Sequence, residues 1–249
     1  MKLAHAKTIS AAALVLVALA ACNRSDPPSE ELKKGAEELV DAVETGSPMA
    51  QPETAFAPQD TCSTLDGGAP FLAALGAAVE MRDTDVLVAL AANDVKLGFG
   101  GVDGAANLRA SLDAEGSVLW DELAEMMPMG CAANDVGGMT IPYYFAQTSN
   151  LDPFEAMIVT GTEVPLRSAP EGDAPNIANL SWREVAVIPE ADGTTPDNGW
   201  VHVRVPARGE TAEMTGYIRT SSLRSMIDYR LLASSRNGRW RITALLAGD

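Results

Sequence analysis

The sequence contains very little histidine: its 249 residues include His5 and His202 only, together with three cysteines. This shortage weakens any mechanism that needs a histidine dyad or a histidine-rich metal site, and we expect no cofactor and no metal. Basic residues are also few, with 18 lysines and arginines against 34 acidic residues and a net charge of -16. Because such a surface repels phosphate backbones, a nucleic-acid partner is not expected.

Long apolar runs are absent except near the amino terminus. The run Ile9–Ala21 is shorter than the roughly 20 residues that span a bilayer, and it follows a short basic segment. It therefore indicates a signal peptide over residues 1–21. The run ends in Leu19-Ala20-Ala21-Cys22, which resembles the lipobox of bacterial lipoproteins. The alternative is an ordinary signal peptide followed by an incidental cysteine.

The lipobox resemblance implies that the mature chain begins at a lipidated Cys22 and is held on a membrane through this anchor. Two or more acyl chains hold a protein firmly, whereas one chain binds only marginally. The next residue is Asn23 and not the aspartate that resembles an inner-membrane retention signal. In a Gram-negative source, this favours the outer membrane of the cell envelope, with the protein facing the periplasm.

Lipidation of the first mature residue leaves two cysteines, Cys62 and Cys131. In an oxidising compartment two cysteines allow one connectivity, and we predict a Cys62–Cys131 disulfide. The alternative, a reactive thiol, needs a nearby base, and none is evident.

The rest of the chain divides by composition and hydrophobic pattern. Residues 22–59 are rich in proline and read as a lipid-anchored linker, with a short amphipathic helix over Ser29–Glu44. A docked helix and a solvated spacer remain equally open. Residues 60–155 predict an α-rich domain, residues 156–224 carry short β-like runs, and residues 225–249 predict a β-hairpin.

Local signals place several elements within these regions. The α-rich region is expected to contain helices starting at Pro70 and after Asp83, over Ala105–Leu112 and over Val118–Met127. The second of these is expected to run to about Ala92. Strands are expected over Val95–Phe99, Ile141–Ala146, Met157–Gly161, Glu184–Ile188, Trp200–Val205 and Met214–Ile218. The hairpin is expected to turn at Asn237-Gly238, because both positions tolerate positive φ.

Four short motifs in the β region share a family likeness. They are Val164–Pro170, Asn198–Val203, Thr215–Ile218 and Ser221–Leu223, and in this order they resemble the bacterial SH3-like (SH3b) domain. The resemblance implies a small all-β barrel over residues 156–224, with a core of Leu166, Val185, Trp200, Val203 and Ile218.

Members of this family often bind peptidoglycan or peptides, whereas others are spacers. The resemblance implies a candidate ligand groove made by Arg167, Trp182, Trp200 and Tyr217. For Trp200 and Tyr217 the preferred alternative is a place in the barrel core, and for Trp182 an incidental half-buried position.

The carboxyl-terminal residues Asp228–Asp249 resemble the final strands of cone-shaped α+β folds of the nuclear-transport-factor type. This likeness implies that residues 225–249 complete the domain formed by residues 60–155. The predicted fold class is therefore α+β, with an α-rich amino-terminal domain, an SH3-like barrel and a β-hairpin.

The sequence shows no catalytic constellation. The acidic groups Asp83 with Asp85, and Asp121 with Glu122 and Glu125, read as solvated helix faces. The ten basic residues after position 155 are all arginine, and they either neutralise the acidic half, which we prefer, or hold acidic ligands. We therefore predict a non-enzymatic envelope lipoprotein that binds the cell wall, a peptide or a partner protein. The alternatives are a carboxylate-dependent cell-wall hydrolase targeted by the SH3-like domain, and a structural assembly factor.

Overall fold

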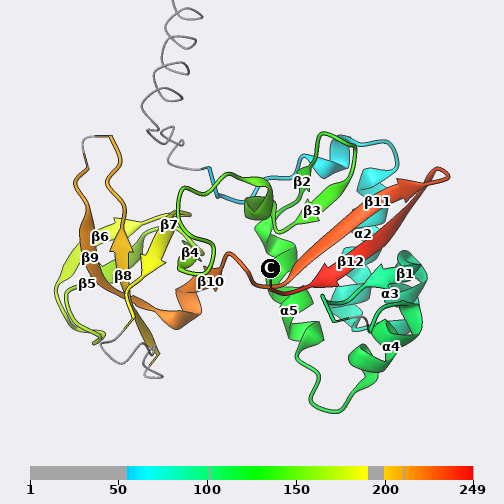
Figure 1. Ribbon diagram of the computed structural model, residues 1–249, viewed down its shortest axis with the longest axis horizontal. Coiled ribbons are helices and arrows are strands. Elements are labelled where there is room, and N and C mark those ends of the chain that lie inside the picture. The colour runs from blue at the N-terminus through cyan, green and yellow to red at the C-terminus, as the bar shows by residue number, and fades with distance from the viewer. Residues whose placement is uncertain (1–54, 101, 190–198, 210, 249) are drawn as a thin grey trace, which may run out of the picture. The chain divides into compact units, whose positions relative to one another are not determined.

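Two β-sheets organise the chain in the computed structural model, which describes residues 55–100, 102–189, 199–209 and 211–248 (Figure 1). Both sheets lie within the unit formed by residues 50–249. The predicted α+β class is confirmed. The predicted signal peptide (1–21), the lipidation site Cys22, the helix over Ser29–Glu44 and most of the linker lie outside the described residues. None of the helices in the described ranges has the length and apolarity needed to cross a membrane.

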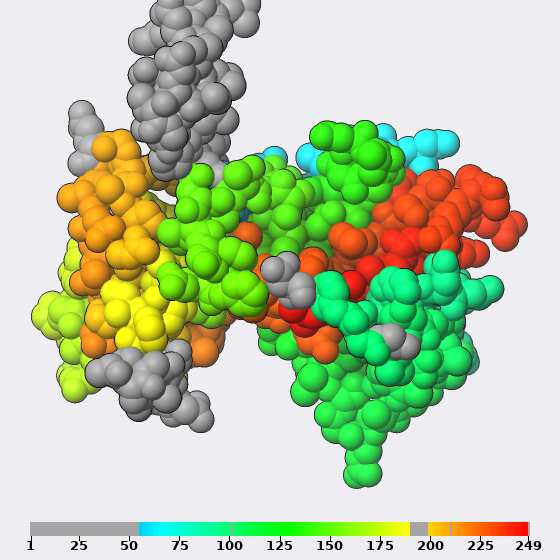
Figure 2. All heavy atoms as spheres, in the orientation of Figure 1, coloured from blue at the N-terminus to red at the C-terminus, as the bar shows by residue number. Residues whose placement is uncertain are grey.

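The first sheet has five strands, and the carboxyl-terminal hairpin lies inside it. Its parallel pair joins β1 (Ala91–Lys96) to β12 (Arg239–Leu246), and its other pairs are antiparallel. In Figure 2 the hairpin, coloured red, lies between segments of the 60–155 region. Residues far apart in sequence therefore build one sheet. In spatial order the strands are β1 (Ala91–Lys96), β12 (Arg239–Leu246), β11 (Arg230–Arg236), β3 (Met139–Ile141) and β2 (Ala132–Ala133).

Four α-helices contribute their apolar residues to one core with this sheet. One fully buried leucine from each helix lies in the same cluster as Leu231 of the hairpin: Leu75 of α2 (Gly68–Met81), Leu87 of α3 (Thr84–Leu90), Leu108 of α4 (Ala105–Asp113) and Leu123 of α5 (Leu119–Met126). At about 25 cal/mol per Å² of apolar surface, such burial is the main stabilising contribution. The helices are α2 (Gly68–Met81), α3 (Thr84–Leu90), α4 (Ala105–Asp113) and α5 (Leu119–Met126).

The structure confirms a predicted helix cap and a predicted hairpin turn. The Asp83 carboxylate accepts a hydrogen bond from the Val86 amide at 3.0 Å and caps α3. The hairpin turns at Asn237 and Gly238, with φ of 55° and 72°, between the paired residues Arg236 and Arg239.

Two predicted strands are wrong in their bounds. The segment Ala91–Lys96 is β1, so the helix α3 ends at Leu90 and the expected strand Val95–Phe99 starts too late. The segment is a strand because it pairs with β12, and no pattern within the segment indicates that pairing. The expected strand Ile141–Ala146 is strand only through Ile141, because Pro142 has no N–H to donate. A 3₁₀ turn, η3 (Tyr143–Ala146), follows.

The second sheet has seven antiparallel strands. The predicted barrel is not closed in the described residues, which form an open sheet with β10 (Leu223–Ser225) and β6 (Asn176–Leu180) as its edge strands. Its core contains Leu166, Val185, Val203 and Ile218, as predicted. The strands β5 (Val164–Arg167), β6 and β10 were not among the expected strands. In spatial order the strands are β10 (Leu223–Ser225), β4 (Ala156–Val159), β7 (Glu184–Val187), β8 (Trp200–Val205), β9 (Met214–Arg219), β5 (Val164–Arg167) and β6 (Asn176–Leu180).

The predicted disulfide is confirmed. Cys62 and Cys131 are bonded, their Cα atoms are 5.7 Å apart, and both are buried in the helix–sheet core. The two neighbouring glycines are tightly enclosed: a Cβ on Gly68 would lie 2.2 Å from the Cys62 carbonyl oxygen, and one on Gly130 would lie 2.3 Å from that of Gln59. The bond therefore lies in a close-packed region.

Asp103 closes the loop that follows β1, and its hydrogen bonds predict a lowered pKa for its carboxyl group. Hydrogen bonds from Lys96 and from the Leu97 amide lower the pKa of Asp103 below 3.8. Since the folded pKa is lowered, the stabilisation is present above pH 3.8 and is lost as the pH falls through the folded value. We expect a carboxyl NMR titration to give a pKa below 3.8, and Lys96→Met to move it toward 3.8. An unchanged pKa in Lys96→Met would contradict this account.

Candidate functional site

One face of the seven-stranded sheet gathers aromatic and cationic side chains. Along β8, Val201, Val203 and Val205 enter the core, so Trp200 and His202 point to the opposite face. The same alternation along β9 places Tyr217 and Arg219 on that face. We call Arg167, Trp200, His202, Tyr217 and Arg219 the aromatic face.

Cross-strand pairing brings these side chains into contact. Trp200 pairs with Arg219, whose Cζ atom lies 4.4 Å from the centre of the indole ring. His202 pairs with Tyr217, and the two rings stack at 4.6 Å with an interplanar angle of 13°. A cation over an aromatic ring and a stacked pair each contribute roughly 0.5–1.5 kcal/mol. The contacts therefore fix the orientation of the stacked His202 and Tyr217 rings and of the Arg219 guanidinium.

Arg167 joins the aromatic face from β5. It pairs with Tyr217, and its Nη1 atom donates to the Ala174 carbonyl at 2.9 Å, which holds the loop between β5 and β6. Its Nε atom is buried without a hydrogen-bond partner among the described residues. Gly216 makes this approach possible, because a Cβ there would lie 2.6 Å from the Arg167 carbonyl oxygen.

Three of the four predicted groove residues share this face, and Trp182 does not. Trp182 has a φ of 43° and packs against a separate cluster formed by Phe56, Tyr144 and Ile158. The prediction that Trp182 joins the groove is wrong because the chain turns between β6 and β7 at this residue. Trp200 is buried as the barrel-core alternative requires, but its ring lies under Arg219 and outside the main cluster.

Sequence reasoning missed Arg219 and gave His202 no role beyond that of a strand residue. The Trp200–Val205 alternation carried a usable signal, because it places position 202 on the same face as position 200. The partner of each residue depends on the register between β8 and β9, which no local pattern specifies.

The acidic groups noted in the sequence have structural partners. Asp83 caps α3, Asp85 pairs with Arg109 at 2.7 Å, and Asp121 pairs with Arg82. Glu122 and Glu125 both contact Arg224. Within the described ranges no three potential metal ligands cluster. Each of these carboxylates is therefore held in a helix cap or an ion pair.

Arg224 connects the seven-stranded sheet to α5. It is 5% exposed, and its guanidinium lies 2.7 Å from Glu122, 3.1 Å from Glu125 and 3.3 Å from Asp228. Burial alone would lower the pKa of Arg224, but the Asp228 and Glu122 carboxylates outweigh it and raise the pKa. Burial also raises the pKa of the neighbouring Tyr144 hydroxyl. In this ion cluster an arginine of the carboxyl-terminal half neutralises acidic residues, as the preferred interpretation of those arginines predicts.

Comparison with known proteins adds little. No protein-family model matches the chain, and no curated protein matches it. A similar solved structure is that of an NTF2-like protein with a cystatin-like fold from Novosphingobium aromaticivorans. It is 11% identical over 90% of this chain and 89% of that chain, with a TM-score of 0.23. A likeness at this TM-score supports no statement about fold or function.

Proposed function

We propose that this chain is a non-enzymatic lipoprotein of the bacterial envelope, and that its seven-stranded sheet is an SH3-like domain that binds the peptide part of peptidoglycan. The single observation that carries the binding proposal is the aromatic face, on which Arg219 stacks over Trp200 beside the His202–Tyr217 pair. The lipobox at Cys22 supports a place on the outer membrane facing the periplasm, where the wall is within reach.

The chemistry of the aromatic face suits a peptide that carries carboxylates. A guanidinium stacked on an indole keeps its N–H edge directed outward, where it can donate two parallel hydrogen bonds to a carboxylate. The half-buried Tyr217 and His202 rings offer a flat apolar surface next to it. Arg219 is exposed, so a ligand can reach it without any rearrangement of the core.

Sedimentation with purified, insoluble peptidoglycan tests the proposal. We expect the full-length chain, kept in solution with mild detergent, to sediment with the polymer. Arg219→Ala and Tyr217→Ala should each weaken retention about five- to tenfold, because each removes one contact worth roughly 1–1.5 kcal/mol. Each variant also loses one stacking contact on the sheet, so the melting temperature should fall by only about 1–6 °C.

Phe154→Ala provides a matched control, because Phe154 is 69% exposed and lies outside the aromatic face. Its retention should equal that of the unmodified chain. If the unmodified chain stays in the supernatant, or if all three variants bind equally, the aromatic face does not bind the wall. If the chain captures a detergent-solubilised envelope protein and does not bind peptidoglycan, a role in assembly is favoured.

A further inference from the structure

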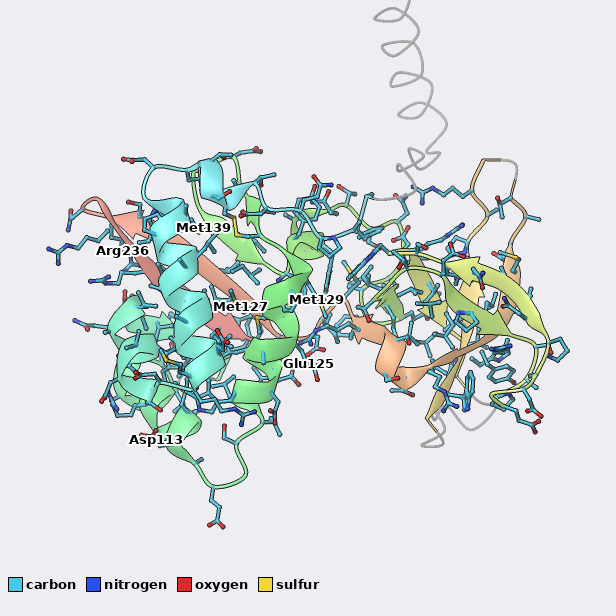
Figure 3. All side chains as sticks on the ribbon, turned by 180° about the vertical axis from the view of Figure 1, so that it is seen from behind. Asp113, Glu125, Met127, Met129, Met139 and Arg236 are labelled. Atoms are coloured by element: carbon cyan, nitrogen blue, oxygen red, sulfur yellow. A yellow bond between two sulfur atoms is a disulfide. The ribbon has the colours of Figure 1, made fainter. Side chains whose placement is uncertain are left out.

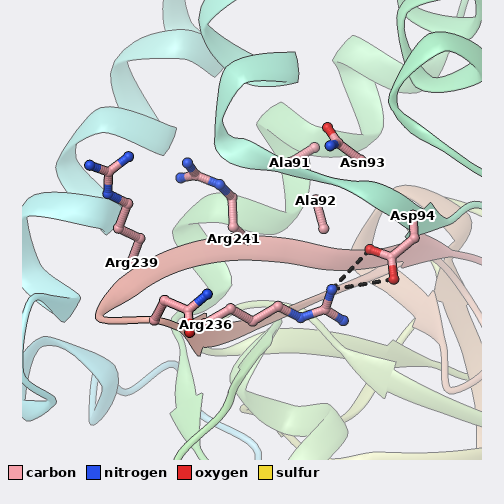
Figure 4. Close-up of a pocket in the computed structure, with 8 residues that line it drawn as sticks. Ala91, Ala92, Asn93, Asp94, Arg236, Arg239 and Arg241 are labelled. Atoms are coloured by element: carbon pink, nitrogen blue, oxygen red, sulfur yellow. Dashed lines mark hydrogen bonds and ion pairs between the residues drawn. The ribbon is translucent and has the colours of Figure 1, made fainter.

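A pocket of about 640 Å³ opens where the tip of the hairpin meets β1. Figure 4 shows Arg239 and Arg241 extending from β12 on the same side, and Arg236 reaching along the hairpin to Asp94. In Figure 3 Arg236 projects from the tip of the hairpin, well away from Glu125 on α5. The pocket is therefore separate from the Arg224 cluster. It is lined by Ala91, Ala92, Asn93, Asp94, Arg236, Asn237, Arg239 and Arg241.

The pocket carries an excess of positive charge on a strongly acidic chain. Three arginines line it, against one carboxylate. Asp94 binds Arg236 through both oxygens, at 2.9 and 3.3 Å. Arg241 donates to the Trp240 carbonyl at 3.0 Å, which orients its guanidinium without neutralising it. Arg239 is exposed and makes no ion pair within the part of the chain that the structure describes. The lining therefore keeps two uncompensated positive charges.

Asp94 compensates the charge of Arg236 only, so the cross-strand neighbour Arg239 keeps its charge. Arg236 and Arg239 are directly opposite each other across the antiparallel hairpin, and like charges in such pairs are destabilising. Asn93 and Asn237 also line the pocket, and their side-chain amides can donate hydrogen bonds. A volume of about 640 Å³ lies within the range of small-molecule sites.

We propose that this pocket binds a phosphomonoester dianion. Two uncompensated guanidinium charges match its charge, and planar guanidiniums donate in parallel to phosphate oxygens. The phosphoryl group belongs either to a soluble small molecule or to a lipid head group. The site is on the five-stranded sheet, so it does not depend on the proposed binding of peptidoglycan by the other sheet.

Isothermal titration of the full-length chain in mild detergent with glycerol 3-phosphate tests the soluble source. Co-sedimentation with phosphatidylcholine vesicles, with and without phosphatidic acid, tests the lipid source. We expect saturable binding in at least one arm. The double variant Arg239→Gln/Arg241→Gln should weaken it at least about tenfold, because it removes two charge-assisted donors.

Two further variants separate a site from general electrostatics. Asp94→Asn should strengthen binding about threefold, because it releases Arg236 from its carboxylate partner. Arg204→Gln removes one positive charge from the other sheet, against two in the double variant, and should leave binding unchanged. The proposal is overturned if neither arm shows binding, or if Arg204→Gln weakens it as much as the double variant does. Binding in one arm only supports the proposal and identifies the source of the phosphoryl group.

Discussion

Replacing Arg224 with alanine is expected to lower the free energy of unfolding by about 3 kcal/mol. The side chain is 5% exposed, and its loss leaves a gap and removes the cation that faces Glu122 and Asp228. Both carboxylates are partly buried, so they retain like-charge repulsion that solvent screens only in part. Glu125 is 68% exposed, and its ion pair adds little to this figure.

Urea unfolding followed by circular dichroism measures this effect, and two variants control it. Arg204→Ala removes an arginine whose partner Glu213 is 54% exposed, so it should change stability by about 0.5 kcal/mol or less. Arg224→Met restores most of the volume without the charge and should be less destabilising than Arg224→Ala. Equal stability of Arg224→Ala and Arg204→Ala would show that the cluster contributes nothing to the fold.

Loss of the Cys62–Cys131 bond is expected to have an effect of similar size. The two cysteines are 69 residues apart, and in the chain-entropy description closing such a loop stabilises the folded state by about 4 kcal/mol. Both sulfurs are buried, so the Cys62→Ala/Cys131→Ala double variant also loses packing contacts in the core. For a chain of this size, the melting temperature should fall by roughly 10 °C.

A reductant provides an independent test of the same prediction. Dithiothreitol should destabilise the unmodified chain and leave the double variant unchanged. Cys22→Ala, which removes a cysteine outside this pair, should behave like the unmodified chain with and without reductant. Insensitivity of the unmodified chain to reduction would contradict a stabilising role for the bond.

Elements with a local signal were predicted in the right place, although α2 starts at Gly68, before Pro70, and α3 ends at Leu90, before Ala92. The Asp83 cap, the helices that follow it and Pro70, and the Asn237-Gly238 turn each depend on interactions within a few residues. The disulfide followed from counting cysteines and from the expected compartment. In each case the physical cause lies in the local backbone or in the chemistry of one residue type.

Elements that depend on distant partners were missed or misplaced. The segment Ala91–Lys96 is a strand because it pairs with β12, about 150 residues later in the chain. The register between β8 and β9 places Arg219 over Trp200. The turn between β6 and β7 places Trp182 against a separate cluster.

For the arginine pocket, too, the sequence indicates one part and the tertiary structure decides the other. The sequence displays Arg236, Arg239 and Arg241 around a hairpin turn, and that much is readable from residue types and their spacing. Their enclosure by Asn93 and Asp94 required the parallel pairing of β1 with β12. Short-range backbone preferences act on neighbouring residues and leave their mark in the sequence. The pairing of distant strands depends on burial of apolar surface by the whole chain, and no single segment records it.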